Sequence, residues 1–223
     1  MSDNKSAFNS SDYDRKIRQT LPYYDQFYEQ VIDLVKIYFN HKTVKWLDIG
    51  CGTGKMGSVA FESVPLAKLV FCDSSEEMIK VARARFNRYN AEFSVCDVQK
   101  LTYTDEFDVI TAIQVNHYFR MNERKVALKK CYEALKNHGL FISFENFAPY
   151  TELGKSIYLE KWKSYQMKEG KNLVECQSHI NRYGKEYFPI SLSENLELMR
   201  SCGFQVVEIL WLSNMQVGLW GIK

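Results

Sequence analysis

Two hydrophobic periods alternate along the chain. Short apolar runs bounded by turn residues predict buried strands, and they lie at 44–49, 68–72, 92–95, 107–113 and 140–144. Apolar residues spaced by three or four positions predict helices, which lie at 24–39, 55–63, 75–87, 122–137, 151–169 and 193–203. The segments 205–212 and 215–222 predict a closing antiparallel pair. Because 107–113 is almost continuously apolar, both faces of the sheet are expected to be covered. The pattern predicts an α/β fold with a mostly parallel sheet.

Polar residues, proline and glycine mark the predicted helix ends. Ser75 and Ser193 are predicted N-caps, because a serine oxygen accepts a hydrogen bond from the first helical turn. Pro22 suits the first turn of helix 24–39, where its missing N–H costs nothing. The pair His138-Gly139 predicts the stop of helix 122–137.

The glycine-rich segment 44–54 is the clearest local signal. Its apolar run carries Asp48 near its end, and Gly50, Gly52 and Gly54 follow at alternate positions. Glycine lets the backbone adopt left-handed angles and approach a ligand closely. Since helix 55–63 begins directly afterwards, its unpaired backbone N–H groups face the loop. The segment therefore predicts a ligand-binding loop.

Three ligands use loops of this kind, and the spacing separates them. A Walker loop needs Gly, four residues and then Gly-Lys-Ser/Thr, but Met56 follows Gly54-Lys55. Residues 52–57 (GTGKMG) match the dinucleotide pattern, although the carboxylate of Asp48 would oppose a pyrophosphate. A sulfonium ligand that carries an amino acid suits the carboxylate better, since its ammonium group can pair with it. An NAD-linked dehydrogenase is the weaker alternative.

Residues 48–54 (DIGCGTG) resemble the nucleotide-binding loop of class I S-adenosylmethionine (SAM)-dependent methyltransferases. In that family the loop wraps the methionine part of SAM, and an acid at the end of the next strand binds the ribose. The next strand here ends at Asp73. The resemblance extends from about residue 13 to the C-terminus. It implies one domain over 1–223, with a Rossmann-like, doubly wound, mostly parallel seven-stranded sheet, an antiparallel C-terminal strand and a helical cap insertion.

The resemblance also implies cofactor contacts on the loops that follow the strands. Residues just after the ribose-binding acid would touch the adenosine, and residues 96–98 match the site where an acid receives the adenine amino group. The loop after strand 107–113 holds cofactor and substrate contacts in the family. The candidate cofactor-binding residues are Tyr24, Asp48, Gly50, Cys51, Gly52, Gly54, Asp73, Ser74, Met78, Cys96, Asp97, Val98, Ile113 and Gln114.

Two aromatic-rich segments flank the predicted sheet. Residues 1–40 resemble the N-terminal cover of some class I methyltransferases, including those that modify or use SAM for tRNA wobble uridine. In those relatives a tyrosine shortly after the proline borders the cofactor, and Tyr24 is the matching position. Residues 147–190 resemble the helical cap of small-molecule methyltransferases. We expect both segments to close over the same edge of the sheet.

Composition narrows the remaining function classes. A net charge of +2 gives no argument for nucleic acid, although it leaves RNA open. No apolar run reaches the length of a membrane span, and the N-terminus is not signal-like. The six cysteines contain no C-x-x-C pair, which favours reduced thiols over disulfides or zinc. We therefore expect a cytoplasmic protein with no membrane partner and no metal.

Methyl transfer from a sulfonium is an in-line displacement, in which positioning of the two reactants supplies much of the catalysis. The methyl donor is already activated, so the protein aligns the acceptor, excludes water and, for some acceptors, removes a proton. The candidate catalytic residues are His117, His179 and Glu145, each of which has a purely structural role as its alternative. No carboxylate pair, nucleophile triad or metal-ligand spacing stands out.

These observations predict a SAM-dependent methyltransferase that acts on a small molecule and releases S-adenosylhomocysteine. Two alternatives remain open. One is a SAM-dependent enzyme that modifies RNA such as tRNA, and a basic, aromatic patch beside the open end of the site would favour it. The other is a module that binds SAM without catalysis. The acceptor, the methylated atom and the oligomeric state cannot be read from the sequence.

Overall fold

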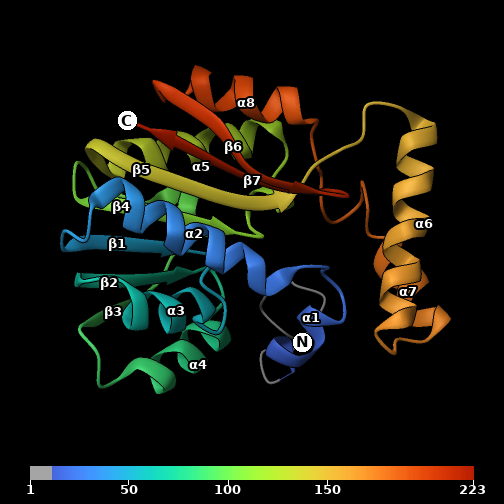
Figure 1. Cartoon of the computed structure of the whole chain (residues 1–223), viewed down its shortest axis with the longest axis horizontal. Coiled ribbons are helices and arrows are strands. Elements are labelled where there is room, and N and C mark those ends of the chain that lie inside the picture. Colours follow the sequence, from blue (N-terminus) through green and yellow to red (C-terminus); the bar gives the residue numbers. More distant parts are fainter. Residues whose placement is uncertain (1–11) are drawn as a thin grey trace.

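A mixed sheet forms the centre of the molecule (Figure 1). The computed structural model describes residues 12–223, and within them seven strands have the order β3-β2-β1-β4-β5-β7-β6. The strands are β1 (Val44–Ile49), β2 (Leu66–Asp73), β3 (Ala91–Val95), β4 (Phe107–Ile113), β5 (Leu135–Asn146), β6 (Val206–Ser213) and β7 (Gln216–Ile222). Strands β1 to β5 are parallel, whereas β7 is antiparallel to both β5 and β6. The strand order reverses between β1 and β4, which is where open α/β sheets bind ligands.

Helices cover both faces of this sheet, because successive strand residues point to opposite sides. Trp46 packs into one core with residues of α2, α3 and α4, and its neighbour Leu47 packs into the other with residues of α5 and α8. The helices are α1 (Tyr13–Arg18), α2 (Tyr24–Phe39), α3 (Lys55–Ser63), α4 (Glu76–Phe86), α5 (Met121–Ala134), α6 (Glu152–Lys168), α7 (Leu173–Ile180) and α8 (Leu192–Ser201), with short 3₁₀ helices η1 (Val98–Lys100) and η2 (Asn116–Tyr118). The expected Rossmann-like fold is confirmed.

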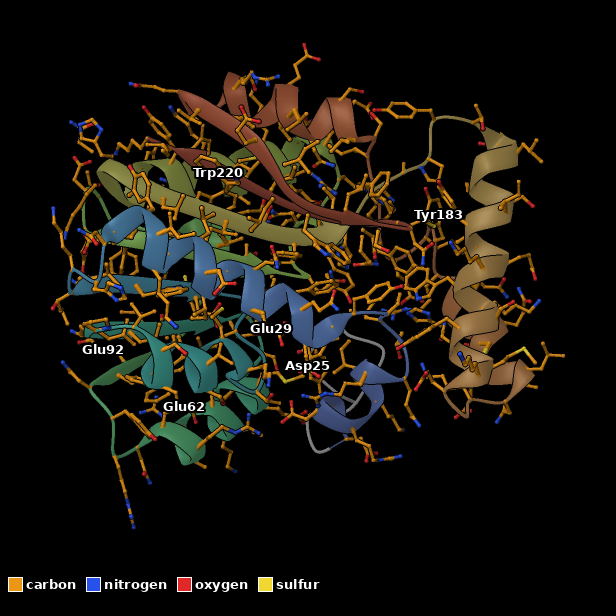
Figure 2. All side chains as sticks on the ribbon, viewed as in Figure 1. Asp25, Glu29, Glu62, Glu92, Tyr183 and Trp220 are labelled. Carbon is orange, nitrogen blue, oxygen red and sulfur yellow. The ribbon has the colours of Figure 1, made fainter. Side chains whose placement is uncertain are left out.

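The N-terminal and cap segments meet beyond the end of the sheet. In Figure 1, α1, α6 and α7 lie past the end of β5, and Figure 2 shows side chains, including the labelled Tyr183, between this cap and the sheet. The indole Nε1 of Trp162 in α6 donates to the carbonyl oxygen of Thr20 at 2.6 Å. The hydroxyl of Tyr165 donates to the carbonyl oxygen of Arg18 at 2.9 Å. The two segments therefore join over the carboxyl edge of the strands.

Some predicted helix ends are wrong. Helix α5 ends at Ala134, and His138-Gly139 lies inside β5 rather than at a helix cap, because the backbone N–H of His138 pairs with the carbonyl of Lys223 at 3.0 Å. Pro22 precedes the N-cap of α2 and is not in its first turn. Ser191, rather than Ser193, caps α8, because its hydroxyl accepts from the backbone N–H of Glu194.

The predicted cap at Ser75 is confirmed, since its side chain accepts a hydrogen bond from the backbone N–H of Met78. Helix α7 was not predicted separately, because its eight residues give too short a periodic signal. No helix between residues 12 and 223 is both long enough and apolar enough to span a bilayer.

Candidate functional site

The glycine loop between β1 and α3 has the strained geometry that its sequence predicts. Gly50 and Gly52 have φ angles of 59° and 54°, in the left-handed region that favours glycine. A Cβ on Gly50 would collide with the side chain of Val115, so the loop after β4 packs directly on the glycine. A Cβ on Gly52 would meet no atom within 4 Å, so here the backbone angle, not crowding, requires glycine. The loop thus leaves its backbone open to a neighbouring cavity.

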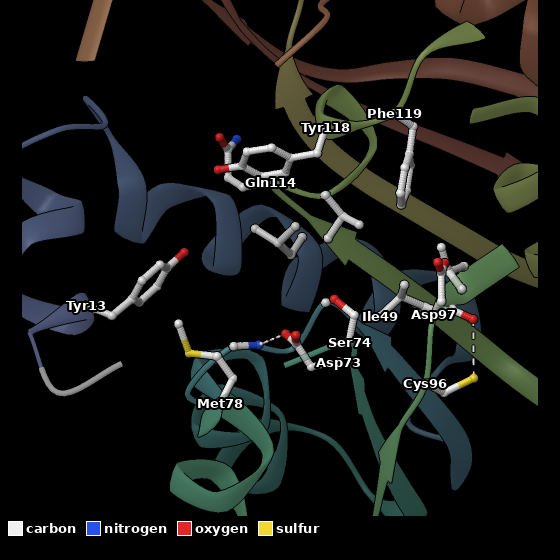
Figure 3. Close-up of a pocket in the computed structure, with 15 residues that line it drawn as sticks. Tyr13, Ile49, Asp73, Ser74, Met78, Cys96, Asp97, Gln114, Tyr118 and Phe119 are labelled. Carbon is white, nitrogen blue, oxygen red and sulfur yellow. Dashed lines mark hydrogen bonds between the residues drawn. The ribbon is translucent and has the colours of Figure 1, made fainter. Parts of the chain in front are cut away.

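That cavity, which we call the cofactor cavity, has a volume of about 750 Å³ and lies along the carboxyl ends of β1, β2, β3 and β4 (Figure 3). Figure 3 shows Asp73, Ser74 and Met78 on one side, Asp97 and Cys96 at one end, and Gln114 with Tyr118 opposite. Its lining residues are Tyr13, Ile49, Gly50, Gly52, Asp73, Ser74, Met78, Cys96, Asp97, Val98, Ile113, Gln114, Val115, Tyr118 and Phe119.

Asp73 is held at the end of β2 by backbone groups. Its Oδ2 accepts the N–H of Gly52 at 2.9 Å, and its Oδ1 accepts the N–H of Ser75 at 2.9 Å. The arrangement fixes the carboxylate of Asp73 beside the glycine loop, at the wall of the cofactor cavity.

A second cavity of about 300 Å³ lies on the other side of the loop, and we call it the loop cavity. Asp48 lines it, is 2% exposed, and accepts a hydrogen bond from the hydroxyl of Thr111 at 2.8 Å. Burial raises the pKa of Asp48 to about 7, with the Thr111 hydrogen bond opposing the rise and the charge of Asp73 adding to it. A cation placed in this cavity would favour the ionised carboxylate.

Helix α1 covers the junction of these cavities and is tied to the loop. The carboxylate of Asp14 accepts the hydroxyl of Thr53 at 2.5 Å and Nη2 of Arg85 at 2.6 Å. Arg18 donates to the carbonyl oxygen of Asp14 at 2.8 Å and also pairs with Asp25. These contacts hold Tyr13 where it lines the cofactor cavity, the loop cavity and a third cavity described next.

The third cavity, the inner cavity, lies under the cap and has a volume of about 400 Å³. Gln114 and Tyr118 line both it and the cofactor cavity, so the two are neighbours across these side chains. Among its described lining residues none is Asp or Glu, whereas Arg182 and two histidines are present. The lining residues are Tyr13, Ile17, Thr20, Leu21, Gln114, His117, Tyr118, Asn146, Trp162, His179, Arg182 and Tyr187.

Gln114 stands at this junction with an unusual backbone. Its φ is 59°, which is uncommon for a residue with a side chain and typical of functional sites. Its amide nitrogen Nε2 donates to Oε1 of Gln216 on β7 at 2.9 Å, and Gln216 bonds in turn to Asn146. The C-terminal strand pair therefore fixes a side chain that faces both cavities.

Most of the predicted cofactor-binding residues come together around the glycine loop. Ten of them line the cofactor cavity, namely Gly50, Gly52, Asp73, Ser74, Met78, Cys96, Asp97, Val98, Ile113 and Gln114. Tyr24, Asp48 and Cys51 line the loop cavity instead. Gly54 lines neither, because a Cβ there would meet the rings of Phe86 and Phe71, so this glycine serves helix packing.

The three candidate catalytic residues separate. His117 and His179 line the inner cavity, but Glu145 lines none of the cavities described above. Glu145 is instead in a buried ion pair with Arg124, which also bonds to Asn195 at 3.1 Å and to the carbonyl of Phe188 at 3.0 Å. The two oxygens of Glu145 are bonded to Arg124 and to Nδ2 of Asn116, so Glu145 lies in a buried hydrogen-bond network outside the described cavities.

Other lining residues were absent from the predicted set. Tyr28 stands four residues after Tyr24 and bonds to it hydroxyl to hydroxyl at 2.7 Å, so the i,i+4 spacing was the signal for it. Trp162 and Tyr187 reach the inner cavity through tertiary packing that no local pattern encodes. Within residues 12–223, no cluster of His, Cys, Asp and Glu has the arrangement of a metal site.

Comparison with known proteins places this geometry in context. Residues 47–139 match a family model described as a methyltransferase domain. The carboxy-S-adenosyl-L-methionine synthase of Nautilia profundicola is 23% identical over 208 residues, which cover 92% of this chain and 88% of that protein. The protein of the same name from Campylobacter fetus is 27% identical over 201 residues, which cover 89% of this chain and 85% of that protein. The structure of magnesium protoporphyrin IX methyltransferase from Synechocystis, solved with bound SAM, superposes on this chain with a TM-score of 0.61 at 14% sequence identity. The superposition covers 99% of this chain and 86% of that protein's chain. This similarity is evidence for the fold.

Proposed function

We propose that this chain, an enzyme that uses SAM and whose residues 47–139 match the model of a methyltransferase domain, transfers a methyl group from SAM to a small molecule held in the inner cavity. The observation that carries the proposal is the shared wall of the two cavities. Gln114 and Tyr118 line both, and Tyr13 lines the loop cavity as well. Two reactants on either side of these residues would be neighbours, which is what an in-line transfer needs.

The residues around the glycine loop fit the cofactor. SAM, when bound, supplies a methyl group already activated on a sulfonium. The open face of Gly52 admits a ligand against the backbone, and the carboxylate of Asp73, which lines the cofactor cavity, is the acceptor for ribose hydroxyls. Asp48 supplies a carboxylate for the ammonium group of the methionine part. The two aspartates are hydrogen-bond acceptors, which suits a ligand whose ribose hydroxyls and ammonium group are donors.

The residues that cover the inner cavity exclude water from it and orient the small molecule. Helix α1 and the cap close the inner cavity through the contacts of Trp162 and Tyr165 with the N-terminal segment. A closed site strengthens the electrostatic interactions inside it and prevents hydrolysis of reactive groups. The small molecule must therefore fit a covered cavity, partly open to solvent, that is bordered by aromatic rings and by cationic or donor groups.

A second reaction is favoured by the relatives. The proteins named carboxy-S-adenosyl-L-methionine synthase align with about nine-tenths of this chain, including the cap that holds Arg182. A guanidinium group beside the cofactor cavity suits a carboxylate, because it can pair with both oxygens. In this second candidate the bond between the small molecule and its carboxyl group breaks, and the carboxyl carbon bonds to the methyl carbon in place of one proton. That proton goes to the small molecule, so the products are carboxylated SAM and the decarboxylated small molecule.

One experiment separates the two reactions. The enzyme is incubated with SAM and the small-molecule fraction of a cell extract, and the products are identified by liquid chromatography and mass spectrometry. Methyl transfer predicts S-adenosylhomocysteine together with a methylated small molecule, and the second candidate predicts SAM that carries an added carboxyl group. Neither product, with SAM unchanged and the cofactor bound, would contradict both. The variant Asp73→Ala, which weakens cofactor binding, is the negative control.

A further inference from the structure

Three nitrogen-bearing side chains surround the ring of Tyr187 in the inner cavity. The ring centroid of His117 lies 6.0 Å from that of Tyr187, and the centroid of His179 lies 6.2 Å from it. The guanidinium carbon of Arg182 lies 5.9 Å from the same centroid. All three groups line the inner cavity. The protonation of the two histidines therefore decides whether this cavity presents donors or acceptors.

The tautomer of His117 is fixed by the end of β5. The backbone N–H of Asn146 donates to Nδ1 of His117 at 3.4 Å. A backbone N–H is only a donor, so Nδ1 must be the unprotonated nitrogen of a neutral ring. The proton of neutral His117 is then on Nε2, on the opposite side of the ring from Asn146.

The tautomer of His179 is fixed by two successive hydrogen bonds, from Lys171 to Gln166 and from Gln166 to His179. Nζ of Lys171 lies 3.2 Å from Oε1 of Gln166, and a charged ammonium group is only a donor, so the amide oxygen of Gln166 must face it. The amide nitrogen of Gln166 then faces Nδ1 of His179, at 3.1 Å, and donates to it. Neutral His179 therefore also carries its proton on Nε2. The orientation follows from the donor-only lysine and does not depend on how the amide atoms were assigned.

Burial and neighbouring cations keep both rings neutral. Burial lowers the pKa of His117 well below its ordinary value, and the charges of Arg124, Arg182 and His179 lower it further. Burial likewise lowers the pKa of His179 to about 3, with Lys171 and Arg182 contributing. Among the described lining residues none is a carboxylate, and the carboxylate that pairs with Arg182 is that of Glu186, which accepts a hydrogen bond from Nε of Arg182 at 2.6 Å. A neutral histidine with its proton on Nε2 and its Nδ1 already occupied cannot accept a proton from a substrate without breaking that bond.

We propose that His117 and His179 are locked as Nε2–H tautomers and act with Arg182 as hydrogen-bond donors to an oxygen atom of the small-molecule substrate, and that neither histidine is a general base. The inference rests on the proposed function, because it assigns the inner cavity to that substrate. Gln166 and Lys171 are positioning residues, since they act on the substrate only through His179. The cavity then selects molecules with a carbonyl, carboxylate or phosphate oxygen and disfavours acceptors that must lose a proton to a histidine.

The test reads the tautomers directly by NMR. Protein labelled with nitrogen-15 in histidine gives long-range correlations whose pattern distinguishes Nε2–H, Nδ1–H and the imidazolium ion. At about pH 7, both inner-cavity histidines should show the neutral Nε2–H pattern. The exposed residues His41 and His138 provide reference signals. An Nδ1–H pattern or an imidazolium pattern for either inner histidine in the folded protein overturns the proposal.

A variant of Gln166 tests whether this residue fixes the tautomer of His179. Gln166→Glu replaces a donor with an acceptor, so Nδ1 of His179 should become protonated while the signals of His117 keep their pattern. In the turnover assay, the rate of SAM conversion should fall about tenfold, as expected for one misplaced charge-assisted or strong hydrogen bond. Gln177→Glu is the matched control, because Gln177 is exposed on α7 and bonds only to Asn181 among described contacts. It should change neither spectrum nor rate.

The pH dependence of the conversion rate tests whether either histidine acts as a general base. If the histidines are donors, the conversion rate shows no loss between about pH 7 and about pH 5.5 that follows protonation of a histidine base. A histidine limb in that profile, removed by His117→Gln or His179→Gln, overturns the proposal. Failure of the proposed function is a different result, because the protein would then convert no SAM with any small molecule whatever the tautomers show.

Discussion

At the scale of single residues, Asp48 shows how burial and ligand charge oppose each other. The carboxyl lies under the glycine loop with Thr111 as its hydrogen-bond donor, and Nε1 of Trp46 donates to that hydroxyl at 2.9 Å. This chain of donors is too short to offset the loss of water, so the pKa rises to about 7. The empty site thus holds a partly protonated acid that a cationic group would ionise.

The first prediction concerns the pH dependence that follows. Because the folded pKa of Asp48 is raised above its unfolded value, its contribution to stability is present at low pH and is lost as pH rises through about 7. The ammonium group of S-adenosylhomocysteine favours the ionised carboxylate, so ligand affinity should rise between about pH 6 and about pH 8. Calorimetric titration measures this. Asp48→Asn should flatten the dependence, and equal slopes in the two proteins would count against an ammonium partner.

The second prediction concerns Asp73. If its carboxylate accepts both ribose hydroxyls, Asp73→Ala should weaken S-adenosylhomocysteine binding by about 1.5–3 kcal/mol for each charged hydrogen bond lost. Some of the loss will come from the N–H groups of Gly52 and Ser75, which also bond to this carboxylate. Asp73→Asn keeps one acceptor oxygen and should lose less. Calorimetry checks the affinity and far-ultraviolet circular dichroism checks the fold, while an unchanged affinity would place the ribose elsewhere.

At the scale of elements, the ion pair of Arg124 with Glu145 joins four parts of the fold. Arg124 is on α5 and Glu145 near the end of β5, and the guanidinium also reaches Asn195 on α8 and the carbonyl of Phe188 at the end of the cap. The N–H of Phe188 donates to the carbonyl of His117 at 2.6 Å. The pair therefore anchors the cap to the loop that separates the cofactor and inner cavities.

The third prediction follows from this burial. Glu145→Gln leaves the charge of Arg124 buried without its partner, which should lower the free energy of unfolding by about 3–5 kcal/mol in a urea titration. The matched control is Glu133→Gln on α5, the helix that carries Arg124, because the pair of Glu133 with Lys130 is only partly buried and should contribute about 0–1 kcal/mol. Equal small losses in the two variants would mean that the buried pair is not an anchor.

The elements also show what the sequence could and could not predict. Strand β4 and helix α3 have the predicted bounds, because a continuous apolar run and an amphipathic period are local signals. The glycine loop and Asp73 follow from residue order, since both stand at strand ends. The pairing of Glu145 with Arg124 could not be predicted, because the two residues are 21 positions apart and only the packing of α5 on the sheet brings them together. The donor chain from Lys171 to His179 is likewise a product of tertiary contacts.

At the scale of the whole molecule, two segments that are distant in the sequence cover the site. Helix α1 precedes β1, the cap follows β5, and Tyr13 lines all three cavities between them. Asp14 ties this cover to Thr53 in the glycine loop and to Arg85 on α4. The cover therefore contacts the cofactor-binding loop directly, and its opening is expected to depend on ligand.

The fourth prediction concerns that coupling. Hydrogen exchange should slow in residues 13–18 and in the cap helices when S-adenosylhomocysteine is added, because a ligand that contacts Tyr13 in the cofactor cavity would disfavour local opening of the cover. Asp14→Asn should reduce the slowing in α1. Asp12→Asn is the control, since Asp12, the N-cap of α1, forms ion pairs with Arg15 and Lys16 of that helix and with no other residue in 12–223. Protection confined to the loop at 50–54 and the region of Asp73 would make the cover a rigid part of the domain.

The most direct test of the account follows the methyl group of SAM. SAM labelled with carbon-13 in that methyl group is incubated with the enzyme, a small-molecule extract and total RNA, and the two fractions are then separated. We predict that the label moves into a molecule of the small-molecule fraction while S-adenosylhomocysteine accumulates, or that it stays on SAM that has gained a carboxyl group. Label that appears in RNA alone would contradict the assignment of the inner cavity to a small molecule.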